Sequence, residues 1–209
     1  MGRIGVIGDV HAEDEALDRV LAFLADRGVE RIMAVGDIVD GPGDADRCCR
    51  LLADHAVVSV RGNHDRWFLA GQMRDLPHAT AAVEPRSRLF LAGLPRSLAL
   101  ETTAGRLLLC HGLGDDDMAD VRPDDEGHAL ECNAALAALR RGREFELVIA
   151  GHTHRRMVRA FDGLTIINGG TLSRGHDPCA LVVDLEGRTV SFHDVTDGGV
   201  VRVAQAVSF

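Results

Sequence analysis

The sequence contains no lysine and no tyrosine, and this excludes several kinds of enzyme. All 23 basic residues among its 209 are arginine. Without lysine the chain can form neither a Walker-type phosphate-binding loop nor a Schiff base, so P-loop hydrolases and enzymes that bind pyridoxal phosphate through lysine are excluded. No serine lies in a Gly-x-Ser-x-Gly sequence, so the nucleophile elbow of the α/β-hydrolases is also missing.

The cysteines have neither the number nor the spacing of a disulfide or zinc framework. There are five, and no Cys-x-x-Cys sequence occurs. We therefore predict reduced, buried thiols. Cys110 precedes His111, and we expect it to be a buried strand residue rather than a metal ligand.

Long apolar runs are also missing. No stretch approaches the ~18 residues of a membrane helix, and Asp9 comes too early for a signal peptide. We expect a cytoplasmic protein of one domain, residues 1–209, without a membrane partner. The net charge of −9 disfavours stable binding to duplex nucleic acid, so an anionic ligand would need a local positive site. The oligomeric state stays open.

The first third of the chain predicts alternating strands and helices. Apolar spacing and turn residues indicate strands at 4–7, 31–35 and 57–60, and helices at 13–27 and 45–53. This order is typical of a parallel α/β unit.

The remainder of the chain predicts mostly strands. They are expected at 88–91, 98–101, 106–110, 146–150, 164–167, 180–184 and 189–194, with one helix at 128–140. Residues 115–126 form a polar segment with seven acidic residues. We expect a solvated loop there, and the alternative is a lid that disfavours long polyanions.

Five predicted strands end in residues that can bind metal. Ligand sites of open α/β sheets lie beyond the carboxyl ends of the strands, so these side chains are expected to converge. Imidazole, carboxylate and amide ligands together favour Mn, Fe, Zn, Co or Ni over Ca²⁺ or Mg²⁺. The seven candidates are Asp9, His11, Asp37, Asn63, His111, His152 and His154.

Seven ligands are more than one ion needs. Two ions that share a carboxylate would use them economically, and two-metal sites favour in-line displacement at phosphorus. With two carboxylates and one hydroxide, two divalent ions leave a net charge of about +1. Such a centre would attract a phosphate ester to an otherwise acidic protein.

The motif blocks resemble the signature of the calcineurin-like metallophosphoesterases. In family order, the blocks are Asp9-x-His11, Gly36-Asp37, Gly62-Asn63-His64-Asp65, His111 and Gly151-His152-x-His154. The compact size is similar to the small bacterial and archaeal phosphodiesterase branch, in which residues 168–171 would match an Asn-Pro-Gly-Ser segment. The resemblance implies an α/β fold with two mixed β-sheets packed face to face and helices outside.

The resemblance also implies residue roles. Two divalent ions, manganese as first choice, would activate a hydroxide that attacks phosphorus, and His64 would protonate or stabilise the leaving alkoxide. Either Asp40 or Asp65 would orient His64. One ion would be held by Asp9, His11, Asp37 and His154, and the other by Asp37, Asn63, His111 and His152, with Asp37 as the bridge.

The chain departs from the phosphoprotein-phosphatase pattern at Gly41, where that branch has a phosphate-binding arginine. A dianionic monoester gains most from a bidentate arginine, so this loss favours diesters. Arg61 matches the family pattern as a substrate contact, and Arg155, Arg156 or Arg174 could replace the missing cation. We rank a phosphodiesterase for small or cyclic nucleotide-like diesters first. A phosphomonoesterase or phosphoprotein phosphatase comes second, and a dinucleoside polyphosphate hydrolase third. A scaffold without turnover is the alternative of a different class.

Five histidines lie outside these blocks, and we expect them at the surface or at helix ends. Of these, His128 adjoins the acidic segment, and we expect His176 near the mouth of the site. The five are His55, His78, His128, His176 and His193.

Overall fold

The computed structural model describes the backbone of residues 1–209 and the side chains of residues 1–200 and 206–209. The helices are α1 (Asp14–Ala25), α2 (Ala45–Asp54), α3 (Asn63–Leu69), α4 (Pro85–Gly93), α5 (His128–Glu131) and α6 (Ala134–Gly142). The strands are β1 (Arg3–Ile7), β2 (Arg31–Ala34), β3 (Val58–Ser59), β4 (Ser97–Thr102), β5 (Gly105–Cys110), β6 (Leu147–Ala150), β7 (Met157–Phe161), β8 (Leu164–Asn168), β9 (Cys179–Asp184), β10 (Thr189–Thr196) and β11 (Gly199–Ser208).

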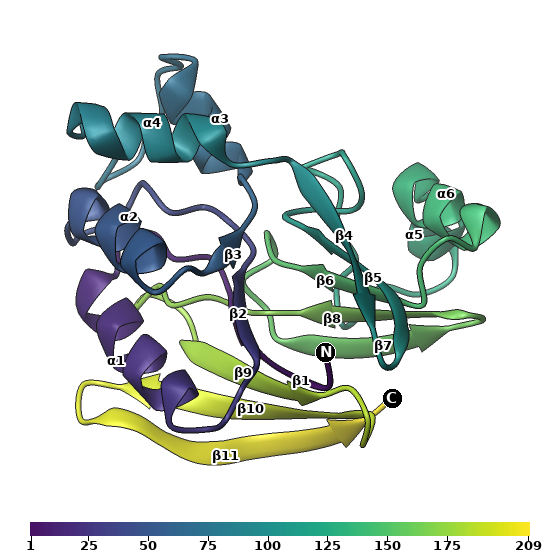
Figure 1. Cartoon of the computed structure of the whole chain (residues 1–209). Helices are drawn as coiled ribbons and strands as arrows, with labels where there is room; N and C mark the ends of the chain where they lie inside the picture. The colour runs from purple at the N-terminus through teal and green to yellow at the C-terminus, as the bar shows by residue number, and fades with distance from the viewer.

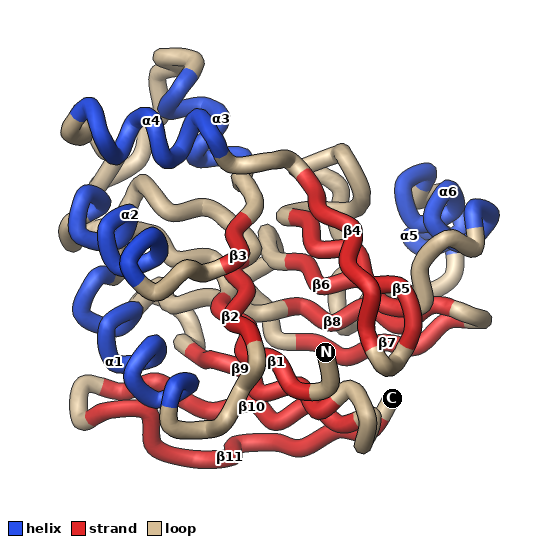
Figure 2. The backbone as a smooth tube through the Cα atoms, in the orientation of Figure 1, coloured by secondary structure: helices blue, strands red, loops and turns tan.

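Two mixed β-sheets form the centre of the molecule, which confirms the predicted fold (Figure 1). The first sheet has the order β11-β10-β9-β1-β2-β3, with β1, β2 and β3 parallel and β9 antiparallel to β1. The second has the order β4-β5-β6-β8-β7, with β5, β6 and β8 parallel and antiparallel strands at both edges. The helices lie on the outer sides of the two sheets (Figure 2).

Alternation along the strands explains this layering. In β5, Leu107 and Leu109 belong to the apolar core between the sheets, whereas Leu108 and Cys110 belong to the core beneath α6. Successive strand residues point to opposite faces, and both faces are covered here. This double burial accounts for the continuous apolar runs that the sequence shows in the central strands.

The helices cover the sheets through apolar stripes. In α1, Leu17, Leu21 and Leu24 repeat at helical spacing and pack into the core on the outer face of the first sheet. Leu136 of α6 packs against the second sheet. None of the helices combines the length and apolar character that a membrane crossing needs, over the part of the chain that the structure describes.

Two predicted elements are wrong. The strand expected at 88–91 lies within α4, where Pro85 occupies the first turn and the buried residues Ser87 and Leu91 are four apart. This burial spacing belongs to a helix packed on one side. The single helix expected at 128–140 is two helices, because the Asn133 side chain accepts a hydrogen bond from the Leu136 N–H and starts α6 anew.

Three further elements were not predicted. They are α3, β7 and β11. The most important for the site is α3, since the Gly-Asn-His-Asp block forms its first turn rather than an extended strand end. His193 also differs from the expectation of a surface or capping histidine: it is 5% exposed and its ring packs 4.8 Å from that of Phe23.

Candidate metal centre and catalytic cleft

The seven candidate ligands meet at one edge of the two sheets. Each follows the strand that the sequence assigned to it, and most are buried. In chain order they are Asp9, His11, Asp37, Asn63, His111, His152 and His154.

One group of ligand atoms gathers around Asp9. His154 Nε2 lies 3.1 Å from Asp9 Oδ2 and 2.9 Å from His11 Nε2. Asp37 Oδ2 lies 3.8 Å from His11 Nε2 on the other side. Asp9, His11 and His154 each offer one atom within 4.8 Å of the others, a spacing at which a single ion can bind all three.

A second group gathers around Asn63. Its Oδ1 lies 2.8 Å from His111 Nε2 and 3.0 Å from His152 Nδ1. Asp37 Oδ2 is 3.3 Å from the same His111 nitrogen. Asp37 therefore lies between the two groups, where a bridging ligand has to be.

The tautomers of two histidines fit metal binding. His11 Nδ1 lies 2.9 Å from the Asp40 carbonyl oxygen, and His111 Nδ1 lies 2.8 Å from the Val35 carbonyl oxygen. A carbonyl only accepts, so each Nδ1 donates its proton, and a neutral ring then directs the Nε2 lone pair into the site. At His111 this lone pair faces oxygens of Asn63 and Asp37, an arrangement that a cation between them would stabilise.

The charges of the site also favour a cation. Burial opposes ionisation of Asp37, but His111 and His11 outweigh it and hold the pKa of Asp37 below its ordinary value. Burial likewise opposes protonation of His111, yet Asp37 and Asp9 raise its pKa to about 10. A proton on His111 Nε2 would take the position of a metal ion, so a metal ion held by His111 would displace that proton.

The ligand loops have an unusual backbone. His11, Asp37, His152 and His154 all have φ between 46° and 68°, which is rare for residues with side chains. Such conformations persist where the surrounding structure enforces them, commonly at functional sites. Gly62 allows a close approach here, because a Cβ would overlap the carboxylate of Asp37.

His64 and Asp40 form a hydrogen-bonded pair beside the ligands. His64 Nδ1 donates to Asp40 Oδ2 at 2.9 Å. Burial lowers the pKa of His64, but Asp40 and Asp37 outweigh this effect and raise it. Of the two acids that the sequence left open, Asp40 is therefore the one in contact with the His64 ring.

Asp65 holds the backbone instead. It is fully buried, and its Oδ1 accepts the N–H groups of Ile38 and Val39 at 2.8 and 3.2 Å. Its Oδ2 accepts the Gly62 N–H at 3.0 Å, which caps α3. Asp65 thus ties the start of α3 to the Asp37 loop, and it makes no hydrogen bond to His64 within the described side chains.

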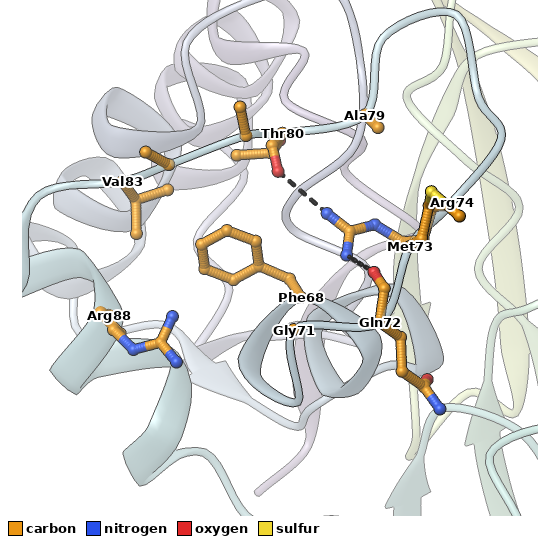
Figure 3. A pocket seen from close by; sticks show the side chains of 11 residues that line it. Phe68, Gly71, Gln72, Met73, Arg74, Ala79, Thr80, Val83 and Arg88 are labelled. Carbon is orange, nitrogen blue, oxygen red and sulfur yellow. Dashed lines mark hydrogen bonds between the residues drawn. The ribbon is translucent and has the colours of Figure 1, made fainter.

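A loop after α3 fixes Asp40. Asp40 Oδ1 accepts the Thr80 N–H at 2.8 Å, and Arg74 Nε lies 2.7 Å from Asp40 Oδ2, an ion pair without hydrogen-bond geometry. Arg74 also donates to the carbonyls of Gln72 and Thr80 and so spans this loop (Figure 3). Burial opposes ionisation of Asp40, but His64, Thr80 and Arg74 outweigh it and lower its pKa. The sequence carried no motif that could have identified Arg74.

A cleft of about 460 Å³ opens over this centre. His176, expected near the mouth of the site, lines it, and its ring centroid is 4.5 Å from that of His154. His78, expected at the surface, also lines it. The lining residues are His11, Asp40, Gly41, Pro42, His64, Leu76, Pro77, His78, His154, Ser173 and His176.

The predicted substrate arginines are not part of this lining. Arg174 binds Glu13 through Nε and Nη2, at 3.0 and 2.7 Å, and Arg155 pairs with Asp124 at 2.6 Å. Arg156, the other proposed replacement, pairs with Asp194 at 2.8 Å. Arg61 is half-buried at the end of β3, and its backbone N–H donates to the Pro95 carbonyl.

The acidic segment 115–126 is attached to the body of the protein by arginines. Arg66 of α3 binds Asp117 through two hydrogen bonds of 2.6 and 2.9 Å. The Arg155–Asp124 ion pair makes a second attachment. These contacts offset part of the negative charge of segment 115–126. That this segment acts as a lid stays a prediction.

Comparison with known proteins identifies the family. A family model described as the calcineurin-like phosphoesterase superfamily domain matches residues 3–188. A probable metallophosphoesterase of Methanothermobacter thermautotrophicus is 28% identical over 198 residues, 93% of this chain and 92% of the relative. The crystal structure of a metallophosphoesterase from Sphaerobacter thermophilus aligns with a TM-score of 0.72 at 23% identity, over 93% of this chain and 88% of that one.

An archaeal phosphodiesterase has the same fold, with a TM-score of 0.56 at 16% identity over 92% of this chain and 99% of that one. The matched residues include all the motif blocks of the candidate metal centre and the strands that precede them. The chain belongs to the calcineurin-like phosphoesterase superfamily.

Proposed function

We propose that the protein is a metal-dependent phosphodiesterase that hydrolyses small, nucleotide-like diesters. Two divalent transition-metal ions, manganese first, with Fe, Zn, Ni or Co as alternatives, would be held in the two ligand groups. Asp9, His11, Asp37 and His154 form one, and Asp37, Asn63, His111 and His152 form the other. Bound there, the ions would supply Lewis acidity toward water and phosphate.

The preference for diesters rests on one observation: the residues that line the cleft, within the described chain, include no arginine. At position 41 no side chain fits, because a Cβ on Gly41 would overlap the His11 carbonyl. Two of the arginines that could have replaced it, Arg155 and Arg174, are paired with acids. A monoanionic diester needs less positive charge than a dianionic monoester, so this cleft suits the diester better.

His64 is the proposed proton donor to the leaving oxygen. Asp40 accepts its Nδ1–H at 2.9 Å, which fixes the ring and leaves Nε2 for the substrate. Both residues line the cleft, but Asp40 is only 6% exposed and its carboxylate contacts the His64 ring, so we expect Asp40 to act through His64. The archaeal phosphodiesterase of the same fold supports the proposal, because diester hydrolysis is then a reaction compatible with this fold.

The test compares bis-p-nitrophenyl phosphate with p-nitrophenyl phosphate, each with Mn²⁺ and with EDTA. We expect an EDTA-sensitive rate in which the diester dominates. A dominant monoester rate would refute the diester preference and favour the phosphomonoesterase alternative. Bound metal without turnover of either ester would refute hydrolysis of simple esters, leaving a polyphosphate substrate or the scaffold alternative.

A further inference from the structure

A second cleft lies next to the catalytic one and is also lined by His64. It has a volume of about 670 Å³, within the range of small-molecule sites. It shares His64 and Leu76 with the catalytic cleft, so these two residues border both clefts. Its remaining lining residues are Trp67, Gln72, Met73, Arg74 and Asp75.

The Trp67 ring is held next to His64. Both lie on α3, three residues apart, and their ring centroids are 5.0 Å apart at an interplanar angle of 57°. The Arg66 guanidinium lies 5.7 Å from the Trp67 ring centroid and is itself fixed by two hydrogen bonds to Asp117. An aromatic ring with so little freedom can bind a flat ligand at low entropic cost.

The rim of this cleft exposes apolar side chains. Met73 is 99% exposed and Leu76 is 41% exposed, and among the described side chains only Leu89 and Met118 are other large apolar residues of this kind. Apolar side chains gathered around a pocket are typical of ligand sites. Gln72 adds an amide that can hydrogen-bond, and its side chain points away from the Phe68 ring (Figure 3).

We propose that this second cleft binds the leaving group of the substrate and that Trp67 selects leaving alcohols that carry a planar ring, such as a nucleoside. The inference rests on the proposed function, in which His64 protonates the leaving oxygen. Hydrolysis forms a P–O bond from water and breaks the bond to the alcohol, which leaves with the proton of His64. The alcohol must therefore lie on the His64 side of the phosphate, where Trp67, Met73 and Leu76 are.

The neighbouring cavity around Phe68 does not meet the requirement that the leaving alcohol lie beside His64. It has a volume of about 480 Å³ and is lined by residues such as Phe68, Thr80 and Arg88 (Figure 3). His64 is not among the described residues that line it. The cleft lined by His64, Trp67 of α3 and Leu76 is therefore the one that can contact a leaving group.

Fluorescence tests binding without turnover. Trp67 is the only tryptophan and the chain has no tyrosine, so emission reports on this residue alone. We expect saturable quenching of the wild-type protein by adenosine and none by ribose at the same concentrations. No quenching by adenosine, or equal effects of the two compounds, would overturn the proposal.

Kinetics test selection of the leaving group. The substrates are methyl benzyl phosphate and methyl cyclohexylmethyl phosphate, whose alcohols are similar in size but differ in planarity. With Mn²⁺, we expect the wild type to release benzyl alcohol with the higher kcat/KM. Trp67→Leu should reduce this preference roughly tenfold, the low end of what one stacked ring contributes, and Trp67→Phe should keep most of it.

An unchanged preference in Trp67→Leu would overturn the role of Trp67. Failure of the wild type to hydrolyse either diester with Mn²⁺ would instead count against the proposed function. The fluorescence titration would then still decide whether this cleft binds a planar ring. The two failures are therefore distinguishable.

Discussion

Asp40 contacts the ring of His64, whereas Asp65 binds backbone N–H groups at the start of α3, and isosteric substitutions separate their roles. Asp65 accepts three backbone N–H groups, among them those of Ile38 and Gly62. Asparagine keeps one acceptor oxygen but turns its amide N–H toward the Gly62 N–H. The change therefore removes one hydrogen bond to a charged group inside the protein.

Such a bond contributes about 1.5–3 kcal/mol, and a chain of this length loses about 2–4 °C in Tm for each kcal/mol. Burial and the Asp37 carboxylate raise the pKa of Asp65 to about 7, so removing this charge offsets part of the loss. We expect Asp65→Asn to lower Tm by about 3–6 °C, the lower part of the range that the energy of this bond and the Tm change per kcal/mol give together. Thermal unfolding followed by circular dichroism measures it.

Asp40→Asn is the matched variant, since it changes the partner of the His64 ring. We expect it to slow alkyl diesters about 10²-fold while nitrophenyl diesters change much less, because poor leaving groups depend most on the proton. Asp65→Asn should leave this ratio as in the wild type. Selective slowing of alkyl diesters in Asp65→Asn, with an unchanged Tm, would refute our assignment and make Asp65 the residue that orients His64.

Three other substitutions test the site and the fold. Asp37→Asn should remove most bound metal, measured by mass spectrometry, and nearly all turnover; wild-type metal content and rate would contradict a shared bridge. Gly41→Ala should cost about 1–3 kcal/mol in thermal unfolding because its Cβ overlaps the His11 carbonyl, whereas Gly93→Ala, with open space, serves as the neutral control. Burial and Arg27 lower the pKa of His193 below its ordinary 6.5, so folding disfavours its protonation and stability should fall as pH drops below that value. Chemical denaturation at pH 7 and about pH 5 should show a smaller fall in His193→Gln, and an equal fall would exclude this residue as a cause.

The order of strands and helices in the first third of the chain could be predicted because local signals agreed there. The strand expected at 31–35 and the helix expected at 45–53 match β2 and α2 within one residue at each end. In contrast, residues 88–91 combine apolar and charged side chains in a pattern that fits a strand as well as a helix. Only the packing of α4 against α2 decides that Leu91 lies on a helix.

The identity of the metal ligand candidates came from the sequence alone. Each motif block places a polar side chain directly after an apolar strand, and parallel strands end at one edge. The resemblance assigned Asp9 and His154 to one ion and Asn63 and His111 to the other. The distances in the folded chain group them in the same way.

The surroundings of these side chains depended on tertiary structure. The sequence left Asp40 and Asp65 as equal partners for His64, and only the position of α3 against the Asp37 loop separates them. It proposed Arg155 and Arg174 as substrate contacts, but their pairing with Asp124 and Glu13 joins segments 31 and 161 residues apart. Local spacing can specify which residues follow a strand. Which charges neutralise each other, and which ring borders the cleft, is decided by contacts between distant segments that form only when the two sheets pack together.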